Sequence, residues 1–166
     1  MDKFNNEFRG FFFADGCASI VKLNRTAKYN GKRVGKIIRK YITYSARLQI
    51  TQRDDNSEML EKIKELYGGA IYKTKSTIIH DSGGKKYDSK PTITWIVERT
   101  DIVHEISAML LNSAFIYRNI DAVKAVYEFC DWRLKRGLQV KRTDKDVEKI
   151  IEWRDRVTEA HKYQGQ

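Results

Sequence analysis

The chain has 166 residues, of which 41% are hydrophobic and 33% are charged, and it carries a formal net charge of +10. This length suits one folded domain with its own core, so we treat residues 1–166 as a single domain. No apolar run approaches the roughly 18 residues that a membrane-spanning helix needs, and the polar N-terminus is unlike a signal peptide. Cys17 and Cys130 form neither a zinc motif nor a disulfide framework, which indicates a reducing, intracellular compartment.

The stretch Phe8–Gly16, Phe-Arg-Gly-Phe-Phe-Phe-Ala-Asp-Gly, predicts a short apolar helix near the start of the chain. We expect Asn5 or Asn6 to cap its N-terminus, because a side-chain oxygen there accepts a hydrogen bond from the first turn. Gly16 is expected to close the helix in the left-handed conformation that glycine tolerates. Taken alone, such a run is typical of a core helix with a glycine cap.

Small residues and a carboxylate distinguish this helix from an ordinary one. Gly10 and Ala14 are four positions apart and fall on one face, where they let a second helix approach closely. Asp15 lies at the C-terminal end, where the partial negative charge of the helix makes a carboxylate unfavourable unless a cation compensates it. The alternative to a core helix is therefore a divalent-metal site where two such helices meet.

The segment Val21–Arg53 contains ten basic residues and no acidic one. Its excess of positive charge equals that of the whole chain. A solvated face is the ordinary explanation of a charge run, but an acid-free run of this length is better explained by a polyanion, above all nucleic acid. A membrane surface fits less well, because the residues alternate as in a strand and not as in a basic amphipathic helix.

Alternation with a period of two predicts two strands in this part of the chain. The first strand follows Gly16 and ends at an Asn30-Gly31 turn. The basic segment Lys32–Lys40 is expected to be the second arm of a long hairpin, and a clearer strand spans Ile42–Gln52. In the first strand we assign one face to Ile20, Lys22, Asn24 and Thr26, and the other to Val21, Leu23 and Arg25. In the second, the apolar face holds Tyr44, Ala46, Leu48 and Ile50, and the polar face holds Thr43, Ser45, Arg47, Gln49 and Thr51. That polar face is suited to hydrogen bonds with base edges.

The rest of the chain predicts one helix, two more strands and three further helices. Asp55-Asn56-Ser57 is expected to cap a helix that Gly68-Gly69 closes. Strands are expected over Ala70–Ile79 and Thr92–Val97, with the loop His80–Lys90 between them. The later helices are expected to begin at Thr100 or Asp101, at about Asn119 and at Thr143. Paired strands with helices between the pairs indicate an α+β fold whose antiparallel sheet carries helices on one face.

The stretch Phe8–Gly16 resembles the nonapeptide motif of the LAGLIDADG homing endonucleases. The identical positions are Gly10, Ala14, Asp15 and Gly16, and the positions that match in kind are Phe8, Phe11 and Phe12. Arg9 stands where the motif has a small residue, and Phe13 replaces an acidic position that varies within the family. The resemblance extends from about Phe4 to Arg136. It implies an αββαββα fold with a curved, four-stranded antiparallel sheet, to which residues 137–166 add a C-terminal helical extension.

A single copy of the motif implies a homodimer. In family members with one motif, the motif helices of two subunits pack at the two-fold axis, and the DNA target is palindromic or nearly so. The resemblance assigns Phe8, Gly10, Phe11 and Ala14 to the dimer interface. It implies a site-specific double-strand DNA endonuclease that hydrolyses phosphodiester bonds with Mg²⁺, or with Mn²⁺ as a substitute.

The resemblance also assigns individual roles. Asp15 and the backbone carbonyl of Ala14 are expected to bind the metal, and Gln52 aligns with the glutamine that positions water in the family. Arg118 is expected to supply the basic catalytic group, with Tyr117 as the alternative. For contacts to double-stranded DNA we expect Lys22, Asn24, Thr26, Lys28, Thr43, Ser45, Arg47, Gln49, Lys73, Lys75 and Thr94. The lysines are assigned to phosphates, and Asn24, Arg47 and Gln49 to base edges.

Two other functions stay open. A non-catalytic relative, acting as a DNA-binding regulator or as an RNA-splicing helper (maturase), would share the scaffold, but such proteins tend to lose the motif aspartate that this chain retains in Asp15. A basic α+β interaction module with an accidental motif would not explain the acid-free strands. We expect no membrane partner and no small-molecule substrate. An organelle, a bacterial cytoplasm and a phage-infected cell are all compatible locations.

Overall fold

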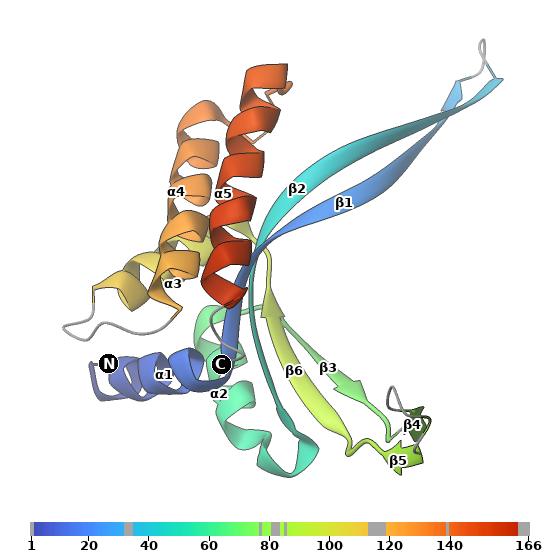
Figure 1. Cartoon of the computed structure of the whole chain (residues 1–166). Coiled ribbons are helices and arrows are strands. Elements are labelled where there is room, and N and C mark those ends of the chain that lie inside the picture. Colours follow the sequence, from blue (N-terminus) through green and yellow to red (C-terminus); the bar gives the residue numbers. More distant parts are fainter. Residues whose placement is uncertain are drawn as a thin grey trace.

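A four-stranded antiparallel sheet with helices on one face organises the chain (Figure 1). The computed structural model describes residues 2–31, 35–76, 78–80, 84, 86–112, 119–138 and 140–162. The strand order is β1-β2-β6-β3, and the bounds are Gly16–Gly31 for β1, Gly35–Arg53 for β2, Thr92–Val97 for β6 and Ala70–Thr74 for β3. The predicted α+β class and antiparallel sheet are confirmed.

Five α-helices accompany the sheet in the described part of the chain. They are α1 over Asp2–Asp15, α2 over Glu58–Tyr67, α3 over Thr100–Leu111, α4 over Ile120–Arg136 and α5 over Asp144–Lys162, and a 3-10 turn, η1, spans Asp54–Asn56 before α2. The order α1-β1-β2-α2-β3-β6-α3 is the predicted αββαββα arrangement. None of the described helices is long and apolar enough to cross a membrane.

A small hairpin interrupts the second pair of strands. Its strands are β4, Ile78–His80, and β5, Lys86–Asp88, which pair only with each other in the described structure. The expectation of one strand over Ala70–Ile79 followed by a loop is therefore wrong. The predicted Asn30-Gly31 turn is wrong as well, because both residues belong to β1 and the ladder continues to the pair Gly31–Gly35. The expected long hairpin is present, and Lys36–Lys40 belongs to its second arm as predicted.

The core lies between the helices and the inner face of the sheet. Phe8 and Phe12 of α1 are fully buried there, together with Trp95 of β6. Along β2, Tyr44, Ala46, Leu48 and Ile50 are buried, whereas Thr43, Ser45, Arg47 and Gln49 are only partly covered. The alternation predicted for the second strand is therefore confirmed over this part of β2.

The passage from α1 into β1 depends on the lack of a side chain at Gly16. Gly16 is the first residue of β1 and does not adopt a left-handed φ, so the predicted left-handed cap is wrong. A Cβ at Gly16 would lie 2.5 Å from the carbonyl oxygen of Phe12 and 2.6 Å from its ring atom Cδ2. The expected asparagine cap is also wrong, because α1 begins at Asp2 and places Asn5 inside the helix, where its Oδ1 accepts a hydrogen bond from the Tyr67 hydroxyl at 2.7 Å.

The C-terminal helices hold the long hairpin from one side. In α5, Arg154 Nε donates a hydrogen bond to the carbonyl of Ile20 in β1 at 3.2 Å. In α4, Arg133 Nη1 donates to the carbonyl of Tyr44 in β2 at 2.9 Å. Thr143 opens α5 as predicted, since its backbone N–H donates to Asp146 Oδ2 at 2.6 Å and its hydroxyl accepts from the Asp146 N–H at 3.3 Å, which is a reciprocal cap.

Gly68-Gly69 closes α2 as predicted, and Gly69 offers a test of how closely α2 and β6 pack. Gly69 has a φ of +92°, and a Cβ there would lie 2.6 Å from the Ile96 carbonyl oxygen, whereas Gly84 has a φ of +79° with open space around it. Gly84→Ala is expected to cost about 1–2 kcal/mol, the penalty for a Cβ in the left-handed region. Gly69→Ala is expected to cost about 1–3 kcal/mol more because of the clash. Urea unfolding of both variants measures the difference, and equal losses would contradict the packing described here.

Candidate functional site

The end of α1 and the end of β2 bring two of the predicted catalytic residues together. Asp15 is the last residue of α1, and Gln52 is the last residue but one of β2. Gln52 Nε2 donates a hydrogen bond to Asp15 Oδ2 at 2.7 Å. Asp15 and Ala14 are both exposed, so this corner of the molecule is open to a ligand.

The donor atoms at this corner are all oxygens that suit a hard cation. They are the Asp15 carboxylate, the Gln52 amide oxygen and the carbonyls of the last turn of α1, which have no partner within the helix. Mg²⁺ prefers such oxygen donors and keeps several waters. In the part of the chain that the structure describes, no group of three or more His, Cys, Asp or Glu side chains could hold a metal. A metal bound at this corner would therefore need water, phosphate or a second chain to complete its shell.

The predicted basic catalytic group, Arg118, and its alternative, Tyr117, lie outside the described residues. Close to the Asp15 corner, the Cys17 thiol sulfur lies 3.6 Å from the ring Nε2 of His161 in α5. Burial raises the pKa of its thiol, and the nearby Arg47 guanidinium lowers that pKa only in part. The thiol therefore stays protonated near neutral pH.

A strip of α1 around Gly10 and Ala14, here called the bare face, carries little side-chain bulk. Gly10 is exposed, and a Cβ built on it would meet no atom within 4 Å. Ala14 is exposed on the same side, and Phe11 is partly exposed. Nothing within the described subunit requires a glycine at position 10.

Phe8 does not belong to that face, so its assignment to a dimer interface is wrong. Phe8 is fully buried, with its ring centroid 5.0 Å from that of Tyr67 and 6.2 Å from that of Trp95. Its side chain anchors α1 to α2 and β6 within one subunit. Arg9, which departs from the motif, turns toward α3, where its Nε donates to the Met109 carbonyl at 3.0 Å. The side chain of Arg9 thus stabilises the last turn of α3 and leaves the bare face of α1 uncovered.

The register of β1 and β2 places the predicted DNA contacts of the two strands on different faces of the sheet. Directly opposed residues in an antiparallel pair share a face of the sheet. Lys22 pairs with the buried Tyr44, and Asn24 pairs with Ile42, so this face of β1 continues the helix-covered face that begins at Ile20. Lys22, Asn24 and Thr26 are exposed because the hairpin runs out beyond the helices (Figure 1). The side chain of Lys28 lies outside the described part.

The face of the sheet that points away from the helices, here called the open face, carries the other predicted contacts. Thr43, Ser45, Arg47 and Gln49 lie on it, opposite β1 residues that were not predicted, namely Leu23, Val21, Ser19 and Cys17. Thr94 lies on it beside Thr51, with 3.0 Å between their hydroxyl oxygens. The predicted strand-1 and strand-2 contacts thus occupy opposite faces. If Ala18 and Ile20 are taken as inward-facing residues, alternation along β1 assigns Ser19 and Val21 to the open face.

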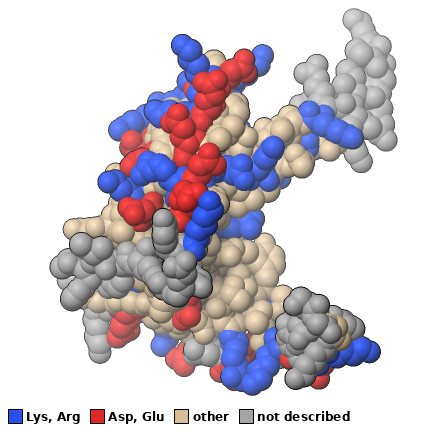
Figure 2. All heavy atoms as spheres, viewed as in Figure 1, with Lys and Arg blue, Asp and Glu red and all other residues tan. Residues whose placement is uncertain are grey.

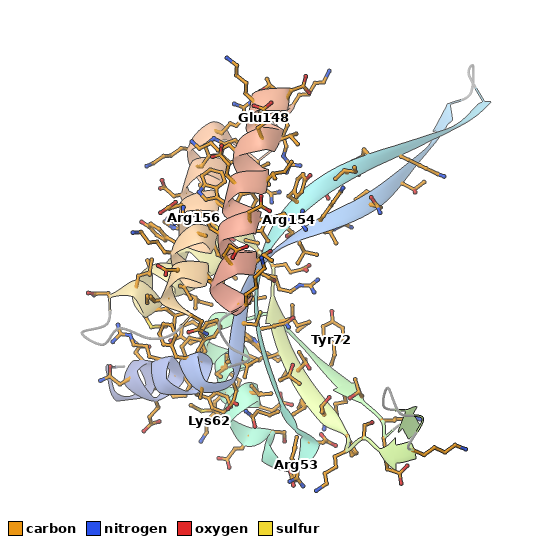
Figure 3. All side chains as sticks on the ribbon, viewed as in Figure 1. Arg53, Lys62, Tyr72, Glu148, Arg154 and Arg156 are labelled. Atoms are coloured by element: carbon orange, nitrogen blue, oxygen red, sulfur yellow. The ribbon has the colours of Figure 1, made fainter. Side chains whose placement is uncertain are left out.

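Lys73, a predicted DNA contact on β3, lies on the other face of the sheet from Thr94. Lys73 pairs with the buried Ile93 and therefore shares the helix-covered face, where its Nζ lies 3.3 Å from Asp54 Oδ1. Lys75 is exposed beyond the end of β3. The open face of β3 instead presents Tyr72, which is 56% exposed and points into the curve of the sheet (Figure 3). The sequence signal for Tyr72 is alternation, because residues two positions apart in a strand, here Ala70, Tyr72 and Thr74, lie on the same face.

Charge is distributed unevenly between the two sides of the molecule. Figure 2 shows basic side chains along the β1–β2 hairpin, whereas acidic side chains gather mainly over α4 and α5. The hairpin belongs to the acid-free segment Val21–Arg53. A positive potential on this arm suits a polyanionic partner.

Comparisons with known proteins agree with this arrangement. The model of the LAGLIDADG endonuclease family matches residues 8–112, which is more than half of the chain. No curated protein matches the chain.

Solved structures of homing endonucleases share the fold. I-TnaI is 12% identical with a TM-score of 0.60, and 96% of each chain is covered. I-CvuI, in complex with the I-CreI target in the presence of 2 mM Mg, is 16% identical with a TM-score of 0.53, and the coverage is 95% of this chain and 81% of that one. A mutant of I-SmaMI is 16% identical with a TM-score of 0.56; 91% of this chain is covered, but it spans only 43% of the length of that protein. At these identities the likeness shows the fold alone.

The two sides of α1 are distinguished by a pair of phenylalanine substitutions. Phe8→Ala is expected to lower the free energy of unfolding by about 3–5 kcal/mol, because it empties a fully buried site. Phe11→Ala is expected to cost less than about 1.5 kcal/mol, since its ring is already partly exposed. Urea unfolding over a range of protein concentrations measures both and separates any effect of self-association. Equal losses would contradict the burial of Phe8 within the subunit.

Proposed function

Because this chain belongs to the LAGLIDADG endonuclease family, we propose that it is a site-specific endonuclease that cuts both strands of a long, nearly palindromic DNA target as a homodimer with a divalent metal. The observation that carries the proposal is the hydrogen bond between Gln52 and the exposed Asp15 at the foot of a helix with one bare face. A core helix with a glycine cap would need neither feature.

The bare face of α1 supports the homodimer. Gly10 has open space around it within the subunit, so its lack of a side chain serves no described contact of its own chain. Small residues four positions apart allow the backbones of two helices to approach closely. Pairing α1 with its two-fold copy would bury Gly10, Phe11 and Ala14 and bring two Asp15 carboxylates near one axis. Two carboxylates in one place repel each other unless a cation lies between them.

The oxygen donors of the site support a divalent metal. Asp15 and the carbonyl of Ala14 would hold it, and I-CvuI was crystallised with DNA in the presence of Mg. A bound Mg²⁺ would supply Lewis acidity at a phosphodiester and a template for the attacking water. The residues of this chain would orient the metal ligand and the water. The Gln52 side-chain N–H holds one Asp15 carboxylate oxygen in place, and the Gln52 side-chain oxygen is free to accept a hydrogen bond from a water. Mn²⁺ has the same charge and accepts the same oxygen donors.

The open face supports double-stranded DNA as the substrate. It is curved (Figure 1), and its β2 residues present hydroxyl, guanidinium and amide groups. A two-stranded β-ribbon fits the major groove, where such groups read base edges. The proposed base contacts are Ser19, Arg25, Thr43, Ser45, Arg47, Gln49, Tyr72 and Thr94. The lysines of the other face are left to attract the phosphate backbone at longer range.

The proposal is tested first by removing the metal-binding carboxylate. Asp15→Asn keeps the size of the side chain and its contact with Gln52 but removes the charge. Cleavage of a randomised palindromic library in Mg²⁺ is expected to fall at least about 10³-fold, while sequence-selective binding remains. The wild type should cut at one enriched site. Selective binding without cutting by either protein, in Mg²⁺ and in Mn²⁺, would overturn the endonuclease and leave a regulator or a maturase.

The homodimer is tested by adding bulk to the bare face. Gly10→Leu should leave the subunit folded, because nothing lies within 4 Å of the new Cβ. It is expected to weaken self-association at least about 10-fold, since each subunit adds a side chain to a close helix contact. Sedimentation equilibrium measures the change. Lys124→Leu on the exposed side of α4 is the matched control, and an unchanged association constant for Gly10→Leu would place the dimer elsewhere.

A further inference from the structure

An ion pair on the open face joins β2 to the residue that directly follows β6. Arg47 of β2 donates from both Nε and Nη2 to Oε1 of Glu98, at 2.8 and 2.5 Å. Glu98 follows β6 directly and stands one step beyond the last ladder pair, Leu48–Val97. The two side chains are 27% and 38% exposed, so the pair faces the solvent side of the sheet and is not part of the core.

A carboxylate is out of place on a surface that is to meet phosphates. Like charges repel, and each uncompensated negative charge opposes binding to DNA. Stability is a weak reason for keeping the pair, because a half-exposed ion pair contributes at most about 1 kcal/mol. The effect of Glu98 on the orientation of the Arg47 side chain is therefore the better explanation of its position.

The bond pattern leaves one edge of the Arg47 guanidinium available. Glu98 occupies the side formed by Nε and Nη2. The end of the group, with one N–H from each of Nη1 and Nη2, still presents two parallel donors. That spacing matches the O6 and N7 acceptors of guanine in the major groove. A guanidinium held on one side has already lost the rotamer freedom that a bidentate contact would otherwise restrict.

We propose that Glu98 is a positioning residue that fixes Arg47 for bidentate recognition of one guanine in each half of the DNA target. This rests on the proposed function, and it deepens it by naming one base and the pair of residues that selects it. Arg47 touches the base, and Glu98 acts only through Arg47. Neighbouring Gln49 and Ser45 on the same strand face then read the adjacent positions.

The test compares base preferences of the full-length wild type and Glu98→Gln. Duplexes bound from a randomised palindromic library are sequenced, with EDTA in place of divalent metal so that bound DNA is not cut. The wild type is expected to select guanine at one symmetry-related pair of positions. Glu98→Gln is expected to lower that preference about 5- to 100-fold and to leave the other positions unchanged, the range for one bidentate contact. Arg47→Lys, which keeps the charge but lacks the fork, is expected to lose the same preference.

Two comparisons make the outcome decisive. Glu105→Gln removes an exposed acid from α3, away from the open face, and should not change any base preference. When Arg47→Lys is already present, adding Glu98→Gln should not change the base preference further. If the Glu98 carboxylate contacted a base directly, the added substitution would still change that preference. If Glu98→Gln tightens binding equally for all sequences, or changes nothing, the positioning role is overturned. If the wild type selects no sequence at all, it is the proposed function that fails.

Discussion

The packing of α1 against the sheet is the constraint on which the rest of the molecule depends. Phe8 and Phe12 bury one side of the helix, and Gly16 brings the start of β1 so close to Phe12 that no side chain fits. The direction of β1 and the position of Asp15 are therefore fixed together. Because one side of α1 packs into the core, the opposite side, with Gly10 and Ala14, faces solvent or a second subunit.

A hairpin as long as that of β1 and β2 carries a structural risk, since β1 lies at the edge of the sheet. An exposed edge invites pairing with other chains. Here Arg154 donates to the Ile20 carbonyl, and the ring Nε2 of His161 lies 3.0 Å from the Ala18 carbonyl oxygen. Helix α5 thus occupies part of this edge near the core. The C-terminal residues, which carry no part of the motif, protect the strand that leaves the motif helix.

Much of this fold was predictable because its elements obey simple periodicity. The alternation along β2 and β6 matches their burial, and Gly68-Gly69 closes α2, with a positive φ at both residues. The errors share a cause, which is that a local pattern was interpreted without its tertiary partner. Gly16 was predicted to be a helix cap, but a glycine is needed there because any side chain would clash with Phe12. Phe8 looked like an interface residue in the motif, but only its contacts with Tyr67 and Trp95 show that it belongs to the core.

The face on which a β1 or β2 side chain lies matters for hydrogen bonding but much less for electrostatics. Charge acts over roughly 8 Å at physiological salt, which is comparable with the thickness of a sheet and its side chains, whereas a hydrogen bond to a base acts over about 3 Å. Lys22 therefore contributes to the positive potential of the hairpin from either face, whereas the proposed base contact of Arg47 depends on the face on which it lies. Composition alone reveals the first property, since Val21–Arg53 has no acid. Register is needed for the second, because only the pairing of β2 with β1 and β6 places Arg47 and Glu98 on one face of the sheet.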